Sequence, residues 1–493
     1  MSATEDFERC YRAVQSRDAR FDGWFFTAVT STSIYCRPSC PAITPKRQNV
    51  RFYPTAAAAQ ANGFRACRRC RPDAAPGSPE WNTRSDVVAR AMRLIADGVV
   101  DREGVSGLAR RLGYSDRQLH RLLHDELGVG PIAIARAQRA HTARLLIETT
   151  TVPVTDIAFA AGFSSVRQFN DTIRAVFATT PSDMRRSRPA LDTRAKQQAS
   201  ANDSITLRLP ARQPFDASAA IAFLGKRTVP GVEHFDPSTT TYTRSLRLPH
   251  GPAVVALTPK ADHVHARLTL TSIADLAAAV ARSRRLLDLD ADPTAVDTVL
   301  GVDEILAPLV AKLPGLRVPG AVDGAELAAR ALLGQQVSVS GARTLAARLA
   351  TRFGEHIDLT GHEQVDRLFP DAATLAEAPD DTFAMPASRK RTVRTLMRTI
   401  ANGEITLDPG ADRDATQAAL LAIAGIGPWT ASYIAMRALG DPDAFPASDL
   451  GVKHALEACG VGGDPKAAVA RAERWRPWRS YATLHLWNSL ERT

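Results

Sequence analysis

Four of the six cysteines form two close pairs, and their spacing restricts the N-terminal part of the chain more than any other feature. The pairs have the form Cys-x3-Cys at residues 36–40 and Cys-x2-Cys at residues 67–70. In a chain without secretory features, paired cysteines predict a metal site rather than disulfides, and four thiolates at this spacing are typical of tetrahedral zinc. Spacing alone leaves open whether the zinc is purely structural. The predicted ligands are Cys36, Cys40, Cys67 and Cys70.

The positive charge of the chain is confined to its first two-fifths. Residues 1–190 carry 28 Lys and Arg against 18 Asp and Glu, which equals the formal net charge of +10 of all 493 residues. A surplus limited to one region indicates a polyanionic partner such as nucleic acid, although a solvated surface can also carry one. Glu5, Asp6 and Glu8 stand where a signal peptide would be apolar, and no apolar run reaches the roughly 18 residues of a membrane span. We therefore expect a soluble, cytoplasmic protein without a membrane partner.

The hydrophobic pattern changes along the chain. A length of 493 residues exceeds what one hydrophobic core supports and predicts several domains. Residues 187–203 are polar and almost free of large apolar side chains, which makes them the clearest linker. Alternating segments from Ile205–Leu209 to His263–Leu270 predict a small antiparallel sheet. From Ile273 onward the apolar spacing is helical.

An internal repeat precedes this linker. Leu108–Ser115 is similar to Ile157–Ser164, and each copy has a short helix, a turn with glycine and a second helix opened by serine, as a helix-turn-helix requires. Residues 85–186 resemble the AraC-type DNA-binding domain. The resemblance implies recognition helices at Ser115–His124 and Ser164–Phe177, which would enter successive major grooves. The implied DNA contacts are Arg117, Gln118 and Arg121 in the first helix and Arg167, Gln168, Asn170 and Arg174 in the second.

The residues around the cysteines resemble the N-terminal domain of the Ada adaptive-response proteins over most of residues 5–75. The resemblance rests on Phe26–Pro41, Asn49–Pro54 and Gly63–Asp73. It implies that one zinc-bound cysteine irreversibly accepts a methyl group from methyl phosphotriesters in DNA, and the matching residue is Cys36.

Basic residues lie close to both cysteine pairs in the sequence. Four thiolates on one Zn²⁺ leave a net charge of −2, which neighbouring cations would offset while they hold a phosphate backbone. The predicted phosphate contacts are Arg37, Arg47, Arg68 and Arg69. Three positions depart from the residues usual in these families: Ser33 where glycine is usual, Ile43 where a basic residue is common, and Asp171 where the second recognition helix often has arginine.

A third motif, Leu421–Ala435, consists of two apolar segments joined by a Gly-Ile-Gly turn. Gly425 and Gly427 would let backbone amides approach a DNA phosphate, although the motif taken alone can equally be a plain turn between helices. Asp449 follows Gly427 by 22 residues and, taken alone, is most simply a helix cap. From about residue 204 onward the chain resembles the AlkA-type 3-methyladenine glycosylases of the helix-hairpin-helix superfamily. Further motifs that carry this resemblance are Leu333–Val339 and Trp475–Trp487.

The glycosylase resemblance assigns roles to single residues. Asp449 is the implied catalytic carboxylate, and Gln336 falls where a residue wedges into the duplex. The implied pocket for the flipped base consists of Trp429, Tyr433 and Trp487, whose electron-rich faces attract a cationic N-alkylated purine. Strand-cleaving members of the superfamily have a Schiff-base lysine at the position of Trp429, and an indole cannot form that imine. We therefore expect a monofunctional glycosylase.

These observations predict a multidomain α+β chain. It would contain a small zinc-binding α/β domain, an all-α tandem helix-turn-helix domain, a small antiparallel sheet domain and an all-α helix-hairpin-helix glycosylase domain. The expected boundaries are 1–78, 82–186, 204–290 and 291–493, with the linker at 187–203.

The resemblances imply a protein that repairs alkylated DNA and responds to it. It would hydrolyse the N-glycosidic bond of alkylated purines, accept methyl groups from DNA phosphotriesters and become a transcriptional activator of the adaptive response. We expect one Zn²⁺ and no organic cofactor. The expected partner is double-stranded DNA, both alkylated sites and a promoter operator, with RNA polymerase as a further candidate partner. The chain would act as a monomer associated with the nucleoid.

Two other functions remain open at this stage. One is an AraC-type regulator whose C-terminal half senses a small molecule. The other is a helix-hairpin-helix glycosylase for oxidised or mismatched bases, with the N-terminal half as a DNA anchor. A second methyl-acceptor motif of the Pro-Cys-His-Arg type is absent from the sequence, so direct repair of O6-alkylguanine is not expected.

Overall fold

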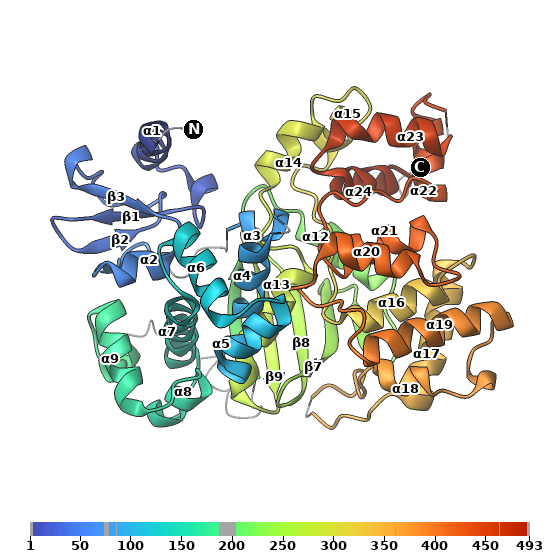
Figure 1. The fold of residues 1–493 in the computed structure, drawn as a ribbon, viewed down its shortest axis with the longest axis horizontal. Coiled ribbons are helices and arrows are strands. Elements are labelled where there is room, and N and C mark those ends of the chain that lie inside the picture. Colours follow the sequence, from blue (N-terminus) through green and yellow to red (C-terminus); the bar gives the residue numbers. More distant parts are fainter. Residues whose placement is uncertain are drawn as a thin grey trace. The chain divides into compact units, whose positions relative to one another are not determined.

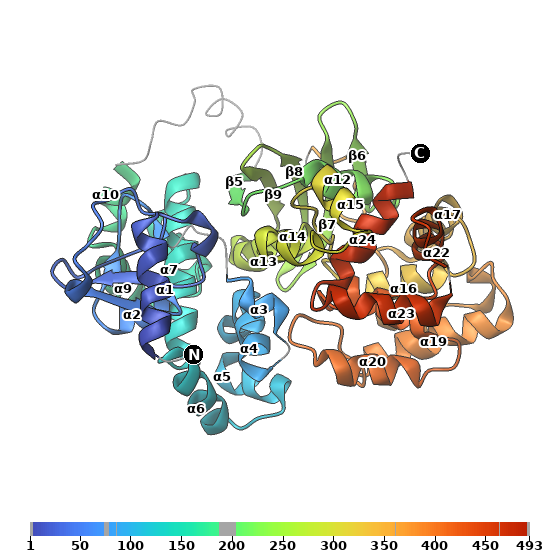
Figure 2. The same cartoon turned by 90° about the horizontal axis from the view of Figure 1, so that it is seen from above.

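The computed structural model describes residues 3–72, 78–84, 86–186, 204–359, 361–462 and 464–490. The chain forms two compact units, Met1–Arg212 with Leu270–Ala281, and Gln213–Thr269 with Arg282–Thr493. Figures 1 and 2 show both units from two directions. The predicted linker 187–203 lies outside the described residues. Across the described ranges, no helix has both the length and the apolar character to span a membrane.

The first unit begins with a small mixed sheet whose strand order is β3-β1-β2-β4. β1 pairs antiparallel with β2 and β3, while β4 runs parallel to β2. Thr55 starts α2 because its side chain accepts a hydrogen bond from the amide of Ala58. The bounds are α1 Ala3–Gln15, β1 Phe26–Val29, β2 Ile34–Cys36, β3 Val50–Tyr53, α2 Ala56–Ala61 and β4 Arg65–Ala66.

Helices α3 to α10 of the same unit contain the predicted tandem helix-turn-helix, in which α6 and α9 correspond to the two predicted recognition helices. Ala57 and Ala58 of α2 are buried in the same apolar cluster as Leu108 and Leu119 of the first copy. The zinc-ligand region and the helices therefore share one core. The bounds are α3 Glu80–Thr83, α4 Val87–Ala96, α5 Val99–Leu112, α6 Asp116–Leu127, α7 Pro131–Thr149, α8 Val154–Ala160, α9 Val166–Phe177 and α10 Pro181–Arg186.

The recognition helices differ slightly from their predicted bounds. Ser115 caps α6 as predicted, but the helix continues three residues past His124, to Leu127. The second helix begins after Ser165 rather than Ser164. The reason is that the Ser165 hydroxyl accepts a hydrogen bond from the backbone amide of Gln168, whereas Ser164 contacts the Gln168 side chain.

The second unit contains an antiparallel sheet region followed by helices. Its strands have the order β9-β8-β7-β6, and β7 pairs antiparallel with β6 and β8. Tyr242 of β7 lies opposite Leu257 of β8, and both side chains are buried. The bounds are α12 Ala217–Gly225, β6 Glu233–Asp236, β7 Thr241–Leu248, β8 Gly251–Pro259 and β9 His263–Leu270; β5, Ser204–Pro210, clusters with the first unit.

The helices of the second unit bury one large apolar core that includes Trp475, Leu396 and Ile434. The multidomain α+β class and its all-helical C-terminal part are confirmed. α13, Leu276–Leu286, begins in the segment Leu270–Ala281 that clusters with the first unit and ends in the second. The bounds of the helices that follow are α14 Pro293–Leu300, α15 Ala307–Lys312, α16 Gly324–Leu333, α17 Val339–Phe353, α18 Ala372–Ala376, α19 Ala387–Ala401, α20 Arg413–Leu421, α21 Pro428–Arg437, α22 Leu450–Ala458, α23 Pro465–Ala472 and α24 Arg479–Leu490.

Candidate metal centre and base pocket

The four paired cysteines meet at one point of the first unit. Cys36 ends β2, and the parallel pairing of β2 with β4 brings Cys67 beside it, since the amide of Cys67 donates to the carbonyl of Tyr35 at 2.9 Å. The sulfur atoms of Cys36, Cys40, Cys67 and Cys70 all lie within 4.8 Å of one another. Tetrahedral zinc with Zn–S bonds of about 2.3 Å needs sulfurs about 3.8 Å apart, so the cluster fits the ion. One Zn²⁺ bound by four cysteines is therefore the cofactor of this unit.

Two of the predicted phosphate contacts near the cluster pair with acidic groups. Nη1 of Arg37 lies 3.5 Å from Oδ2 of Asp22, whose carboxylate is buried. That carboxylate also accepts hydrogen bonds from the amide and hydroxyl of Ser39. Burial raises the pKa of Asp22, and the Ser39 hydrogen bonds oppose that rise. Arg47 pairs with Glu8. Arg37 and Arg47 are thus partly neutralised by the protein, and their contact with DNA stays a prediction.

The other two predicted phosphate contacts, Arg68 and Arg69, lie between the zinc ligands Cys67 and Cys70 in the sequence. Two residues that depart from the family pattern, Ser33 and Ile43, lie near the first cysteine pair in the sequence. Arg68 donates to the carbonyl of Ala178, while Arg69 is exposed and pairs with no acidic group among the described residues. Ser33 has φ 53°, a left-handed conformation that explains why glycine is usual there. Ile43 is 93% exposed, so it leaves an apolar side chain in water beside the cluster.

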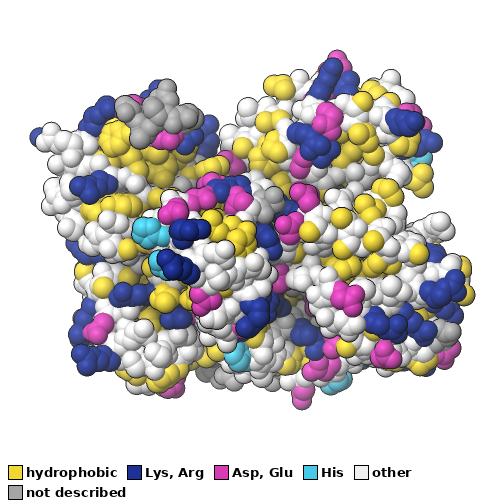
Figure 3. Space-filling view, viewed as in Figure 1, with side chains coloured by type: hydrophobic (Ala, Val, Ile, Leu, Met, Phe, Trp, Pro, Cys, Tyr) yellow, Lys and Arg dark blue, Asp and Glu magenta, His cyan; other side chains and the backbone are white. Residues whose placement is uncertain are grey.

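The recognition helix α6 exposes a basic face. Arg117 and Arg121 lie one turn apart on the exposed side of the helix, as predicted. His124 lies a further turn on, and its ring stacks 6.2 Å from that of His120. Figure 3 shows histidine and basic side chains gathered over α6. The sequence analysis did not include the two histidines, although their spacing on the same helix was the available signal.

Both predicted glutamine contacts take part in helix capping. Gln118 accepts hydrogen bonds from the amide and hydroxyl of Ser115, and Gln168 does the same for Ser164. Their carbonyl oxygens are thus committed to the helix starts. On α9, Arg167 lies 4.0 Å from Asp171, with both side chains strongly exposed. The carboxylate of Asp171 thus faces solvent on the same side of α9 as Arg167.

In the second unit, the predicted catalytic carboxylate is held by three donors. Asp449 caps α22 through Oδ1, which accepts from the amide of Val452 at 2.9 Å. The same oxygen accepts from Nε1 of Trp487 at 2.8 Å, and Oδ2 accepts from Nε1 of Trp429 at 2.7 Å. The helix-cap interpretation of Asp449 is therefore confirmed, and its catalytic role stays a prediction. The carboxylate is fixed at a helix N-terminus, where a negative charge is favourable.

The predicted aromatic residues line one cavity of about 430 Å³ together with Asp449. Trp429 and Tyr433 stack with ring centroids 5.4 Å apart, and Tyr433 is tilted against Trp487 at 6.4 Å. The sequence analysis missed Phe223 of α12, which stacks on Trp487 at 6.5 Å. No local signal marked it, because Phe223 is more than 200 residues distant from its aromatic neighbours in the sequence.

An arginine lies behind these rings. Arg437 donates to the hydroxyl of Tyr433 at 2.9 Å, and its guanidinium lies 4.8 Å from the ring centre of Phe223. Burial by itself would raise the pKa of Tyr433, but the charges of Arg437 and Arg227 lower it below its usual value. The guanidinium of Arg437 and the carboxylate of Asp449 therefore line the same cavity with opposite charges.

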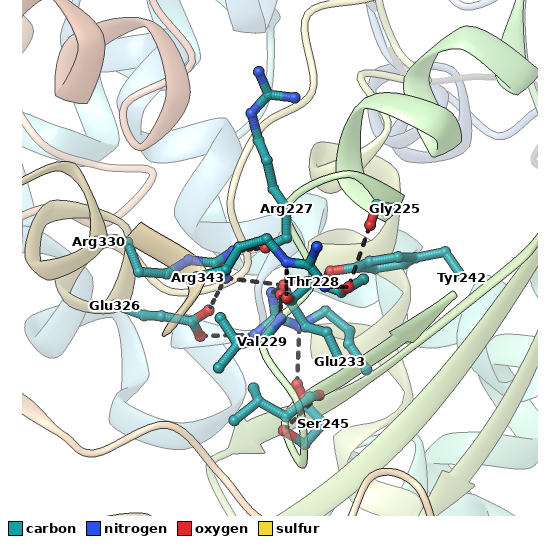
Figure 4. A network of polar contacts seen from close by, with 12 residues as sticks. Gly225, Arg227, Thr228, Val229, Glu233, Tyr242, Ser245, Glu326, Arg330 and Arg343 are labelled. Carbon is teal, nitrogen blue, oxygen red and sulfur yellow. Dashed lines mark hydrogen bonds and ion pairs between the residues drawn. The ribbon is translucent and has the colours of Figure 1, made fainter. Parts of the chain in front are cut away.

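A buried network of charges supports the pocket from the sheet side (Figure 4). Glu233 of β6 accepts from Arg244 at 3.1 Å, from Arg330 of α16 at 3.0 Å and from the hydroxyl of Tyr242 at 2.5 Å. Glu326 of α16 accepts from Arg244 at 2.7 Å and from Arg330 at 2.8 Å. Burial opposes ionisation of Glu233, but the two arginines lower its pKa below the usual value. The network joins the sheet to α16, the helix that leads into the pocket rim.

The loop between α16 and α17 carries the predicted wedge. Gln335 is bound down, since its amide donates to the hydroxyl of Thr430 at 2.8 Å. Gln336 has φ 57°, an unusual conformation for a residue with a side chain, and it is exposed. Its neighbours Val337 and Val339 are exposed apolar residues on the same rim. The loop and the first residue of α17 thus expose Gln336, Val337 and Val339, of which only Gln336 was predicted from the sequence.

The helix-hairpin-helix turn joins α20 to α21. Gly425 has φ 93°, and a Cβ atom there would overlap the hydroxyl of Thr392, which donates to the carbonyl of Ala424 at 2.8 Å. Gly427 caps α21 and faces open space. The first glycine is therefore required by packing, and the second leaves room for another molecule to approach the amides of α21.

Comparison with known proteins covers the whole chain. Family models match residues 9–73 as the metal-binding domain of Ada, residues 108–187 as a helix-turn-helix domain and residues 206–323 as the AlkA N-terminal domain. The chain is 54% identical over 487 residues to a Mycobacterium tuberculosis protein named "Probable bifunctional transcriptional activator/DNA repair enzyme AlkA", covering 99% of this chain and 97% of that protein.

Further relatives match either half. An Escherichia coli protein named "DNA-3-methyladenine glycosylase 2" is 36% identical, covering 56% of this chain and 94% of that protein. The "Bifunctional transcriptional activator/DNA repair enzyme Ada" of Escherichia coli is 34% identical, covering 33% of this chain and 46% of that protein. The solved "3-methyladenine dna-glycosylase from Archaeoglobus fulgidus" has a TM-score of 0.51 at 20% identity, covering 57% of this chain and 97% of that one, which supports a common fold.

Proposed function

The chain belongs to the family of bifunctional transcriptional activators and DNA repair enzymes of the AlkA type, and from this premise we propose a specific division of labour between its two units. The protein binds DNA, repairs alkylation damage and activates transcription. In the proposal, the second unit is a monofunctional glycosylase for alkylated purines. The first unit is a methyl acceptor that becomes a sequence-specific regulator.

The observation that carries the glycosylase proposal is the fixed carboxylate of Asp449 at the rim of an aromatic cavity. A flipped purine with a positive charge would stack against Trp429 and Tyr433. As the bond between the purine nitrogen and C1′ breaks, its electron pair leaves with the base and positive charge develops on the sugar. Asp449 stabilises that charge and orients a water molecule, whose oxygen bonds to C1′ while the proton that it loses passes to solvent. Trp429 offers no amine, so hydrolysis without strand cleavage is proposed.

DNA extrusion would use the rim of the pocket. Gln336 would enter the gap left by the flipped base, with Val337 and Val339 packed against the neighbouring bases. The backbone amides that follow Gly425 and Gly427 would bind a phosphate, since helix N-termini favour anions. The exposure of all three rim side chains supports this role.

For the first unit, we propose Cys36 as the methyl acceptor. Its sulfur would attack the methyl carbon of a phosphotriester; a C–S bond forms, the C–O bond breaks and the phosphodiester leaves with the negative charge. Bound zinc would keep the four sulfurs as thiolates and so sustain the nucleophile. Arg69, which is exposed within the Cys67–Cys70 loop, would meet a DNA phosphate there, whereas the guanidinium of Arg68 donates to the carbonyl of Ala178.

The proposed switch is electrostatic. Methylation converts one thiolate of the cluster to a neutral thioether, so the centre changes from −2 to −1. One unit charge a few ångströms from a phosphate contributes roughly 1–4 kcal/mol at intermediate dielectric, about ten- to a thousandfold in affinity. Operator binding by the full chain before and after reaction with methyl phosphotriester DNA tests this, at several salt concentrations. Equal affinities in both states would contradict the switch.

A direct experiment separates the two proposed activities. The purified chain is incubated with methylated duplex DNA, the released bases are quantified, and the chain is digested to find the methylated cysteine. We expect free alkylated purines, uncut strands and a methyl group on Cys36. Release of oxidised bases alone would favour the alternative glycosylase, and strand cleavage would contradict the monofunctional proposal. Sizing of the chain and its binding to RNA polymerase test the proposed monomer and the proposed polymerase partner.

A further inference from the structure

The second recognition helix ends in a conformation that normally favours glycine. Ala178 terminates α9 with φ 52°, and the corresponding residue of the first copy is Gly128, which terminates α6 with φ 74°. A left-handed conformation costs free energy when the residue carries a Cβ atom. Something outside the helix must therefore stabilise this end of α9.

The stabilising contact comes from the zinc-ligand loop. Arg68, which lies between the ligands Cys67 and Cys70, donates from its guanidinium to the carbonyl of Ala178. A cationic donor at the C-terminal end of a helix satisfies a carbonyl and interacts favourably with the helix dipole. β4, which leads into the loop, also packs against α9.

A second route runs from the same loop to the same helix end. Arg71, one residue past Cys70, pairs with Glu148 near the end of α7. Oε1 of Glu148 lies 3.9 Å from Nε of the buried Arg144. The guanidinium of Arg144 in turn lies 5.4 Å from the ring centre of Phe177, which is the last residue of α9. Figures 1 and 2 both show α9 alongside α7 and close to the small sheet. Two arginines of one loop thus converge on the C-terminal turn of α9.

The first recognition helix lacks such a link within the described ranges. α6 packs against α4 and α5, and its C-terminal turn closes on Gly128 without a contact to the zinc-ligand loop. The two recognition helices of the tandem are therefore held differently. Of the two helices, only α9 receives an arginine contact from the zinc-ligand loop among the described residues.

We propose that Arg68 and Arg71 are positioning residues that couple the thiolate cluster to α9. Zinc bound by Cys67 and Cys70 fixes the loop, and the two arginines then hold the C-terminal turn of α9. Loss of zinc would loosen α9 and leave α6 unchanged. The coupling between the cluster and α9 does not require DNA. Its consequence for DNA binding rests on the proposed regulator function, because a change at the cluster would then alter binding to the half-site contacted by α9.

Hydrogen exchange of the full chain tests the coupling directly. Backbone amides of α6 and α9 are compared in the zinc-loaded chain, after removal of zinc by a chelator, and in zinc-loaded Arg68→Ala/Arg71→Ala. We expect exchange in the last turn of α9 to rise about fivefold or more in the second and third cases, while α6 changes less than about twofold. Arg20→Ala, which removes an exposed arginine paired with Asp18, is the control and should leave α9 unchanged.

Conservative variants and zinc analysis distinguish loss of the arginine contacts from loss of zinc. Arg68→Lys/Arg71→Lys retains both charges and should preserve the protection of α9, whereas Glu148→Gln should weaken it. Elemental analysis should find one zinc in every arginine variant. The proposal is overturned if hydrogen exchange changes equally in α6 and α9, or if exchange in α9 does not change when zinc is removed. It is also overturned if the double alanine variant loses zinc, or if α9 exchanges as fast in the lysine variant as in the alanine variant.

A DNA readout then separates this inference from the proposed function. Duplexes selected by the methylated wild-type chain are footprinted with Arg68→Ala/Arg71→Ala. We expect protection to be lost over the half contacted by α9 and kept over the half contacted by α6. If the wild-type chain selects no sequence, the regulator function fails while the exchange result stands. If selection succeeds and both halves respond equally, the coupling fails.

Discussion

Replacement of Asp449 by asparagine changes the glycosylase site while it preserves the shape of the side chain. The two oxygens of Asp449 accept hydrogen bonds from two indole N–H groups and one backbone amide. Asparagine is an equally good helix cap, so its oxygen can keep the bond from Val452. Its NH₂ group would then replace Oδ2 and face the indole N–H of Trp429, which leaves a donor unpaired.

The magnitudes of the two effects differ. An unpaired donor in the pocket costs about 1–3 kcal/mol of folding free energy. The lost charge matters more for the reaction, because two unit charges about 4 Å apart interact by about 4 kcal/mol at an effective dielectric constant of roughly 20. Each 1.36 kcal/mol of barrier is about tenfold in rate, so we expect Asp449→Asn to slow base release about a thousandfold.

The assay measures free alkylated base from methylated duplex DNA under single-turnover conditions, together with the free energy of unfolding. Asp464→Asn is the matched control, because Asp464 caps α23 through the amide of Ala467 and is exposed. It should release base at the wild-type rate. Methyl uptake on Cys36 should be unchanged in both variants. Base release by folded Asp449→Asn within tenfold of the wild-type rate would refute the proposed role of the carboxylate.

Four further variants test other parts of the structure. Cys67→Ser/Cys70→Ser should bind no zinc by elemental analysis and accept no methyl group, with base release unchanged; retained zinc would exclude the four-thiolate site. Gly425→Ala should lower the free energy of unfolding by about 2–4 kcal/mol, because its Cβ would meet Thr392 in a left-handed turn. Gly427→Ala should unfold like the wild type but bind duplex DNA less tightly, and equal stability losses would contradict this difference. Asp171→Arg should steepen the dependence of the logarithm of DNA affinity on the logarithm of salt concentration by about one unit, and an unchanged slope would place Asp171 away from phosphate.

Local patterns in the sequence determined the types of module that this chain contains. Cysteine spacing, a repeated helix-turn-helix and a Gly-x-Gly turn each act within a few residues, and backbone geometry restricts what such short segments can form. The zinc ligands and the aromatic set around Asp449 came from motifs of this kind, joined to a family resemblance. The structure brings each of these sets together.

The tertiary structure decided which charged and aromatic side chains meet across long sequence separations. Arg68 and Arg37 are both basic residues beside cysteines, yet one binds the end of α9 and the other pairs with buried Asp22. Phe223 and Arg437 reach the pocket from helices that are far apart in the sequence. Neither the composition nor the residue spacing of the sequence distinguishes an arginine that contacts a DNA phosphate from one that pairs with a carboxylate of the same chain. The packing of the folded chain selects between them, because charge and dispersion act over a few ångströms in space regardless of separation along the chain.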